Sequence, residues 1–208
     1  MSKAIKEGEQ NLNATQNLKN DHMIIKRIRN ISQTCSSKLY ADQFIPITDI
    51  EIISVIIEEF VDKFHHGKEE KAYFPETKDK NGFSDDIRKF IIEHELGRRI
   101  AMMLRREIKE WKKKMEKGET SSLNNADRPL NEPVARFLKS YAVFLDDHIQ
   151  KEDKFFDLVE ERDSITNSEN QILLKKYESC KNQAGGEARM TEMVRLIEYL
   201  EAKEWMET

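Results

Sequence analysis

The 208-residue chain is short of the residues that build turns and cross-links, with only 7 glycines, 4 prolines and 2 cysteines. So few glycines and prolines argue against an all-β protein and favour an all-α fold. The two cysteines, Cys35 and Cys180, are isolated, which predicts free thiols in a reducing cytosol and no zinc site. No apolar run approaches the roughly 20 residues of a membrane span, and residues 1–7 lack the apolar core of a signal peptide. We therefore expect a cytoplasmic protein.

A marked excess of charge of one sign is also missing. The 35 basic and 39 acidic residues leave a net charge of −4, which argues against nucleic acid or an anionic membrane as the main partner. The basic run from Arg98 to Lys114 is interleaved with Glu107 and Glu110, so it indicates a solvated helix face and not an anion site. The chain also has no Gly-rich phosphate loop and no Ser-His-Asp spacing that would compete with a metal site.

Apolar residues recur at helical spacing over four long segments. They predict helices over about residues 14–36, 48–75, 84–118 and 129–163. Four such helices joined by loops form an up-and-down four-helix bundle, a fold whose core commonly holds metal sites. Two shorter helices follow, over about 168–183 and 187–205, and neither contains histidine. We expect residues 14–163 to form the bundle and residues 164–208 to form a helical appendage, which packs on the bundle or makes a homodimer contact.

Local signals at the helix ends refine these boundaries. Thr48 with Glu51 has the spacing of a capping box at the start of the second helix, and Ser168 with Gln171 has the same spacing further along. Ser84 is expected to cap the third helix. Pro75 is expected to end the second, because proline removes a backbone donor.

Histidine is scarce too, but its placement is informative. At least one histidine falls on each of the four long helices and none falls elsewhere: His22, His65, His66, His94 and His148. The stretches that start at His65 and His148 both read His-x-x-Lys-Glu-acid-Lys. A histidine and a glutamate four residues apart lie on one helix face, so they can bind one metal ion or two adjacent ions. Four imidazoles with Glu69 and Glu152 would suit two first-row transition metals.

These motifs resemble the hemerythrin-like, or HHE cation-binding, family. The matching pieces lie within about residues 19–163 and are Asn20-Asp21-His22, His65-His66-x-x-Glu69-Glu70 before Tyr73-Phe74-Pro75, Glu93-His94, and His148-x-x-x-Glu152 before Phe155-Phe156. The resemblance implies a non-haem di-iron centre of two Fe ions with an oxo or hydroxo bridge, although Mn or a mixed Fe/Mn pair would also suit the ligands. The ligands that it implies are His22, His65, Glu69, His94, His148 and Glu152, with the two glutamates bridging the metals.

The register of the second helix stays open at this point. His66 and Glu70 are also four residues apart, so they could replace or supplement His65 and Glu69. The shared Lys-Glu-acid-Lys pattern favours His65 and Glu69. Tyr73 lies one turn beyond Glu69, and we expect it to be a core aromatic instead of a residue facing the metals.

One departure from the oxygen-carrying members of the family concerns Arg98. Those proteins place a second histidine one turn after the ligand of the third helix, where this chain has Arg98 after His94. Arginine stays protonated and offers no lone pair to a metal. We expect Arg98 to pair with Glu70 or Asp147, and the ion near His94 to keep an open position.

The resemblance therefore implies a di-iron protein that binds or reacts with a small diatomic or peroxidic ligand, namely O2, NO or peroxide. Such a protein could be an oxidoreductase. The alternative is an iron- or oxygen-sensing or storage protein without catalytic turnover.

Overall fold

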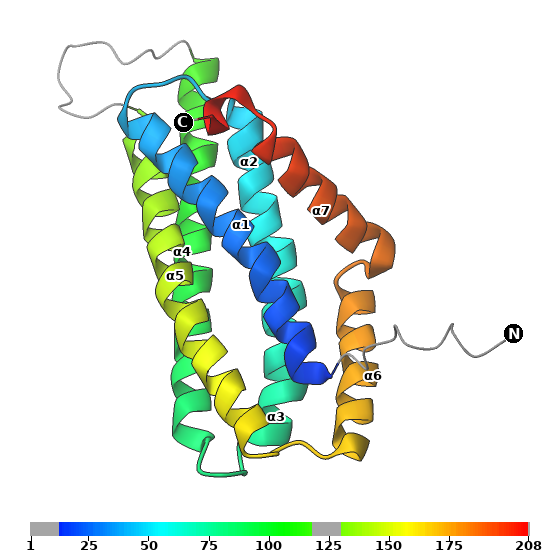
Figure 1. The fold of residues 1–208 in the computed structure, drawn as a ribbon. Helices are drawn as coiled ribbons and strands as arrows, with labels where there is room; N and C mark the ends of the chain where they lie inside the picture. The colour runs from blue at the N-terminus through cyan, green and yellow to red at the C-terminus, as the bar shows by residue number, and fades with distance from the viewer. Residues whose placement is uncertain (1–12, 118–129, 208) are drawn as a thin grey trace, which may run out of the picture.

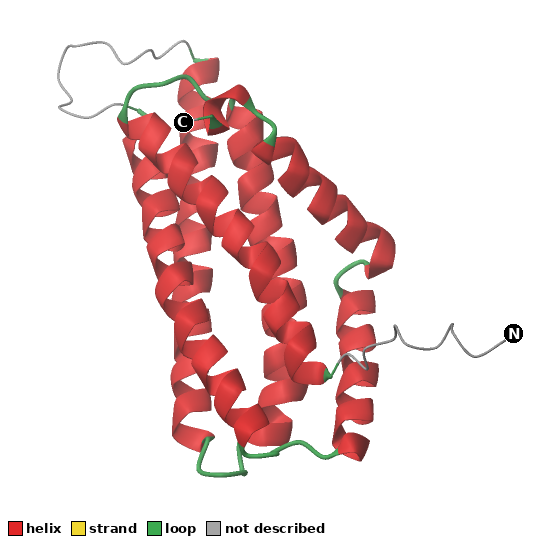
Figure 2. Ribbon diagram, viewed as in Figure 1, coloured by secondary structure: helices red, strands yellow, loops and turns green. Residues whose placement is uncertain are grey.

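The computed structural model describes residues 13–117 and 130–207, and within these residues the chain forms helices and no strand (Figure 2). The first bundle helix is α1 (Ala14–Tyr40), and the third and fourth are α4 (Ser84–Glu116) and α5 (Glu132–Glu161). The second is assembled from four consecutive pieces: α2 (Ile47–Ile56), η1 (Ile57–His66), η2 (Glu69–Tyr73) and α3 (Phe74–Thr77).

The four helices stand side by side, with α1 against α5, α5 against α4, and α2 against both α4 and α1 (Figure 1). Two helices, α6 (Asn167–Gln183) and α7 (Gly186–Glu201), and the short 3-10 turn η3 (Glu204–Met206) complete the described chain. The prediction of an all-α four-helix bundle with a C-terminal helical pair is confirmed. No helix among the described residues is both long enough and apolar enough to cross a membrane.

The second bundle helix changes its winding along its length. Both η1 and η2 are π-helical, with hydrogen bonds from residue i to residue i+5, a form that is rare and often found at functional sites. A π-helical turn holds more residues than an α-helical turn, so consecutive side chains are separated by a smaller angle around the axis. For this reason His65 and His66 are both buried inside the bundle.

The predicted end of this helix at Pro75 is wrong. The chain continues as α3 to Thr77, and Pro75 lies in the first turn of that piece, where a missing backbone N–H is tolerated. The Thr77 hydroxyl donates to the Tyr73 carbonyl at 2.8 Å and secures the last turn. The predicted boundaries at residues 118 and 129 lie outside the described residues.

Three predicted helix caps are wrong, although the predicted starts of the second and third bundle helices lie within one residue of the observed ones. Helix α2 begins one residue before Thr48 and α4 begins with Ser84 itself, and neither start has a side-chain cap. The capping box of α6 is formed by Thr166 with Glu169, not by Ser168. The Glu169 carboxylate accepts the Thr166 backbone N–H at 2.8 Å, so the same sequence spacing is satisfied two residues earlier.

The C-terminal helices pack on the bundle. Helix α6 contacts η2, and α7 contacts α1 and α2. Arg189 on α7 makes a two-pronged ion pair with Glu59 at 2.6 and 2.9 Å, and the Trp205 indole donates to the buried carboxylate of Asp49 at 2.9 Å. A homodimer contact through these helices and a domain boundary near residue 163 remain predictions. Cys35 and Cys180 are free thiols, as predicted, and both are buried.

Two hydrophobic clusters fill the interior and leave a layer between them. One is mainly aliphatic and includes Ile25, Leu104 and Leu145. The other is rich in aromatic rings and includes Phe90 and Phe156. On three of the bundle helices the buried histidines occur between residues of the first cluster and residues of the second. On α5, His148 precedes Ile149 of the first cluster, and Glu152 lies between Ile149 and the second cluster. The fold therefore places a polar layer between the two apolar clusters.

Candidate metal centre

The polar layer holds two groups of potential metal ligands. The first, called here the His22 group, consists of His22, His65, Glu69 and Glu152. The second, the His66 group, consists of His66, His94 and His148. Within each group, one ligand atom from every residue lies within 4.8 Å of the others. All seven side chains are buried, with exposures between 0% and 2%. The structure thus brings together the six predicted residues and adds His66 to them.

The two glutamates connect the groups. The two oxygens of Glu69 lie 3.3 Å from His65 Nε2 and 3.4 Å from His94 Nε2. Those of Glu152 lie 3.4 Å from His22 Nε2, 3.3 Å from His148 Nε2 and 3.2 Å from His94 Nε2. Each carboxylate therefore faces an imidazole of both groups. This is the placement required of carboxylates that bridge two ions in a four-helix bundle.

Four of the five imidazoles are held from behind by a carboxylate. In each case Nδ1 lies within hydrogen-bond distance of an acidic side chain while Nε2 faces the centre. The pairs are His22 with Asp153 at 2.6 Å, His65 with Asp21 at 3.1 Å, His94 with Glu70 at 2.7 Å and His148 with Glu93 at 2.8 Å. A carboxylate behind a histidine fixes the ring and leaves the inner nitrogen available to a metal. Glu70 therefore lies behind an imidazole and does not join either group.

His66 is held differently. Its Nδ1 has no hydrogen-bond partner, and its nearest carboxylate, that of Asp62, is 3.6 Å away. Asp62 instead accepts a hydrogen bond from Arg98 Nε at 2.7 Å. The His66 ring stacks on His94, with 3.8 Å between ring centres. Burial, and the charges of His94 and His65, hold the pKa of His66 well below its ordinary value, so its imidazole is neutral, the form that binds metals.

Several central atoms have no hydrogen-bond partner. They are both carboxylate oxygens of Glu69, one oxygen of Glu152 and His148 Nε2. A buried carboxylate without partners is costly. Oxygen and imidazole nitrogen are suitable donors for first-row transition metals. The unpartnered atoms, which belong to both groups, therefore fit a bound cation.

The charges of the pocket also favour a bound cation. Burial alone would lower the pKa of His22 and His94, but the surrounding carboxylates, Glu152 and Glu69 among them, outweigh burial and raise the values to about 9 and about 10. Burial alone would raise the pKa of Glu152, but His148, His22 and His94 hold it well below its ordinary value. The pocket thus attracts positive charge, which protons or metal ions can supply.

Arg98 lies outside the ligand groups. It donates to Glu70 at 2.6 Å and to Asp62 at 2.7 Å, so the predicted pairing with Glu70 is confirmed. The alternative partner, Asp147, pairs with Lys151 at 2.5 Å. The expectation of an open position beside His94 did not foresee His66, which stacks there.

Aromatic rings enclose the layer. Tyr73 is a buried core residue, as expected, and its hydroxyl lies 2.8 Å from the Thr15 hydroxyl. Phe144 stacks on His148 with 5.1 Å between ring centres. A Cβ at Gly97 would lie 2.6 Å from the Phe144 ring, so a side chain there would displace the ring that stacks on His148. Sequence reasoning gave no role to Gly97, because the constraint comes from another helix.

Lys68 is a second residue that sequence reasoning missed. It is only 1% exposed, forms an ion pair with Asp21 and donates to Asn17 Oδ1 at 2.7 Å. Its counterpart in the second His-x-x-Lys stretch, Lys151, is 45% exposed. The buried ammonium stabilises the charged carboxylate that holds His65. Helical spacing gives no sign of this difference, because the packing of α6 is what covers Lys68 and places the Tyr177 ring beside it.

Comparison with protein families matches residues 13–159 to the hemerythrin HHE cation binding domain. The matched range contains both ligand groups and every carboxylate behind them. Searches among curated proteins and among solved structures gave no match.

Proposed function

The chain belongs to the hemerythrin HHE cation-binding domain family, and from that premise we propose that its buried pocket holds two iron ions that react with a small ligand. The ligand class is peroxide, O2 or NO. The observation that carries the proposal is the set of unpartnered Glu69 and Glu152 oxygens, which lie between two groups of imidazoles. Manganese or a mixed pair would fit the same donors.

The ligand assignment follows the two groups. His22 and His65 would hold one ion, and His94, His148 and His66 the other, with Glu69 and Glu152 shared between them. This assignment retains the six residues expected from the sequence and adds His66 as a supplement to His65. Iron, when bound, supplies a Lewis acid and an electron donor for the small ligand.

The surrounding residues prepare the pocket for this role. Asp153, Asp21, Glu70 and Glu93 orient the imidazoles, and such outer partners tune both metal affinity and reactivity. The aromatic rings on both sides of the layer exclude water and so limit side reactions. Arg98 balances the charge of Glu70 and Asp62 without contributing a metal ligand. Its place in the chain, where oxygen carriers have a histidine, favours reaction over reversible carriage.

Anaerobic titration with ferrous iron tests the proposal. We expect binding to saturate at about two ions per chain, the number that paired sites with bridging carboxylates require. On mixing with hydrogen peroxide, the loaded protein should consume peroxide faster than the same amount of free iron. A plateau at one ion would remove the dinuclear site. A stable oxygen complex that reverses under vacuum, with no consumption of peroxide, would show a carrier.

A further inference from the structure

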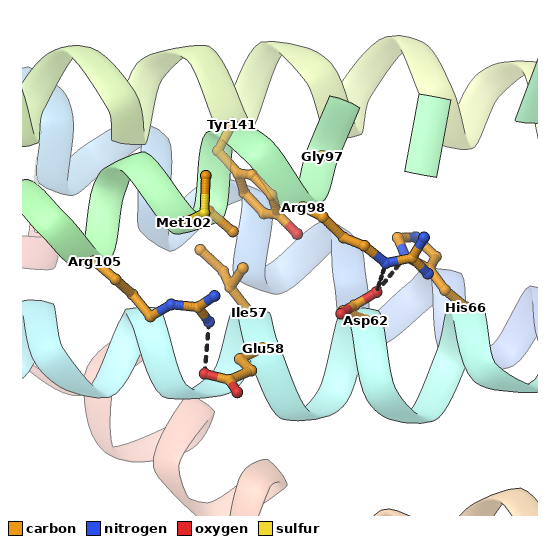
Figure 3. A pocket seen from close by; sticks show the side chains of 10 residues that line it. Ile57, Glu58, Asp62, His66, Gly97, Arg98, Met102, Arg105 and Tyr141 are labelled. Carbon is orange, nitrogen blue, oxygen red and sulfur yellow. Dashed lines mark hydrogen bonds and ion pairs between the residues drawn. The ribbon is translucent and has the colours of Figure 1, made fainter. Parts of the chain in front are cut away.

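A cavity of about 220 Å³ lies between η1, α4 and α5, and His66 closes its inner end (Figure 3). Among the histidines of the polar layer, His66 is the one that lines this cavity. Met102, which is 56% exposed, is another of the residues that line it. A water molecule takes up about 30 Å³ of liquid, so the cavity has room for a peroxide or diatomic molecule with several waters.

The walls explain why this space stays open. On α4 the lining residues nearest the core are Gly97 and Ala101, which carry little or no side chain. Facing them are Ile57 on η1 and Tyr141 on α5. Small residues on one wall and rigid rings or branched chains on the other leave a gap that the bundle does not fill.

The charges that line the cavity are balanced. Arg105 pairs with Glu58 at 2.5 Å, and Arg98 pairs with Asp62 (Figure 3). Neither guanidinium is left without a carboxylate, so the lining gives no advantage to an anion. It suits a small uncharged molecule that can accept or donate hydrogen bonds.

His66 is also the imidazole that the structure holds least firmly. The other four rings have a carboxylate 2.6 to 3.1 Å from Nδ1, whereas the Nδ1 of His66 has no hydrogen bond. Arg98 accounts for the difference, because it draws the Asp62 carboxylate to itself and leaves it 3.6 Å from His66. The same guanidinium bonds Glu70, which holds His94. One residue thus secures the carboxylate behind His94 and leaves the stacked neighbour, His66, without a carboxylate at hydrogen-bond distance.

From these observations we propose that the cavity is the route by which a small uncharged ligand reaches the metal centre, and that His66 is a displaceable ligand that swings into the cavity to admit it. The inference rests on the proposed metal centre and adds to it a path and a moving residue. Movement of His66 would leave an open position on the ion beside His94, the position that the sequence led us to expect.

The test measures the association rate of nitric oxide, a neutral diatomic probe, with the ferrous protein by stopped-flow absorbance. Two variants reduce the space in the cavity: Ala101→Leu puts a larger side chain at a buried lining position, and Met102→Trp puts one at an exposed lining position. Leu96→Trp is the matched control, because Leu96 is a similarly exposed apolar residue of α4 that does not line the cavity. We expect the rate to fall roughly tenfold in both cavity variants and to stay unchanged in the control. Unchanged rates in both cavity variants, with iron content and helical circular dichroism intact, would overturn the route.

His66→Ala tests the moving ligand. Loaded with saturating ferrous iron, this variant should bind nitric oxide severalfold faster than the wild type, although it should hold the second iron more weakly because it lacks one of the proposed ligands. If it lacks an iron even at saturating iron, as His94→Ala should, His66 is a fixed ligand and the second half of the proposal is wrong. Failure of the metal centre itself would appear separately, as wild-type protein that takes up fewer than two irons before any nitric oxide is added.

Discussion

The two ligand groups share their glutamates but differ in how their imidazoles are held. In the His22 group both imidazoles have a carboxylate at Nδ1, and one of these carboxylates, Asp21, is itself paired with the buried Lys68. The His66 group has a third imidazole, and that ring lacks such a carboxylate and borders a cavity. Preorganised ligands favour metal retention, while a loosely held ligand favours exchange. In the proposed centre, the His22 group would retain its metal ion, and the small ligand would enter beside the His66 group.

Removing what the groups share should have the largest effect. Glu152→Gln takes away a carboxylate that faces imidazoles of both groups, so both ions should bind much more weakly. A ligand at 1,000 times its dissociation constant stabilises the native state by about 4 kcal/mol, and most of this gain should disappear. Thermal unfolding with and without ferrous iron measures the loss.

Glu161→Gln is the control, because Glu161 is an exposed residue of the same helix. Without metal, Glu152→Gln should be less stable than the wild type, because it removes a buried carboxylate whose charge His148, His22 and His94 stabilise. If Glu152→Gln still takes up two ions, Glu152 is not shared and the two groups are independent.

Removing one imidazole from each group should have a smaller and unequal effect. His22→Ala leaves the three imidazoles of the His66 group intact, so about one ion should remain tightly bound. His94→Ala removes a ring that faces both glutamates, so the remaining ion should be held more weakly. Metal content after gel filtration gives both values. Equal loss of both ions in the two variants would show that the groups do not act as separate sites.

The carboxylates behind the imidazoles offer a matched pair of variants. Asp153 and Asp62 have nearly the same side-chain exposure, 32% and 31%, and each pairs with a basic residue. Asp153 holds His22 by a hydrogen bond, whereas Asp62 does not bond His66. Asp153→Asn should therefore weaken metal binding by about 10- to 100-fold, and Asp62→Asn much less. Competition with a chromophoric chelator measures both affinities, and equal losses would remove the distinction between held and free imidazoles.

The sequence predicted the parts of this centre that depend on helical spacing. Four bundle helices each carried histidine, and Glu69 and Glu152 followed a histidine by four residues, so a shared pocket could be inferred. The inward position of His66 depends on the π-helical winding of η1, which residue spacing does not reveal. The burial of Lys68 depends on α6, far away in the chain. The sequence offered the pairing of Arg98 with Glu70 as one of two alternatives, but the contacts of His66 and Lys68 with other helices had to come from the three-dimensional structure.

The smallest expected effect is the response of the metal-free protein to pH, which reports the protonation of one histidine in each group. One histidine of each group, His22 and His94, has a pKa of about 9 and about 10 in the folded state, against 6.5 as the ordinary value. A raised folded pKa means that protonation stabilises the native state fully below pH 6.5, and that this stabilisation is lost as pH rises through 9 to 10. The unfolding temperature of the metal-free protein should therefore fall between pH 7 and 10. His66, with its lowered pKa, contributes nothing in this range.

With metal bound, the same histidines hold metal in place of protons, so the fall should be smaller and metal uptake at pH 7 should release protons. Unfolding scans at several pH values, with proton release followed by an indicator dye, test both statements. An unfolding temperature of the metal-free protein that stays constant from pH 7 to 10 would show that His22 and His94 are already neutral at pH 7.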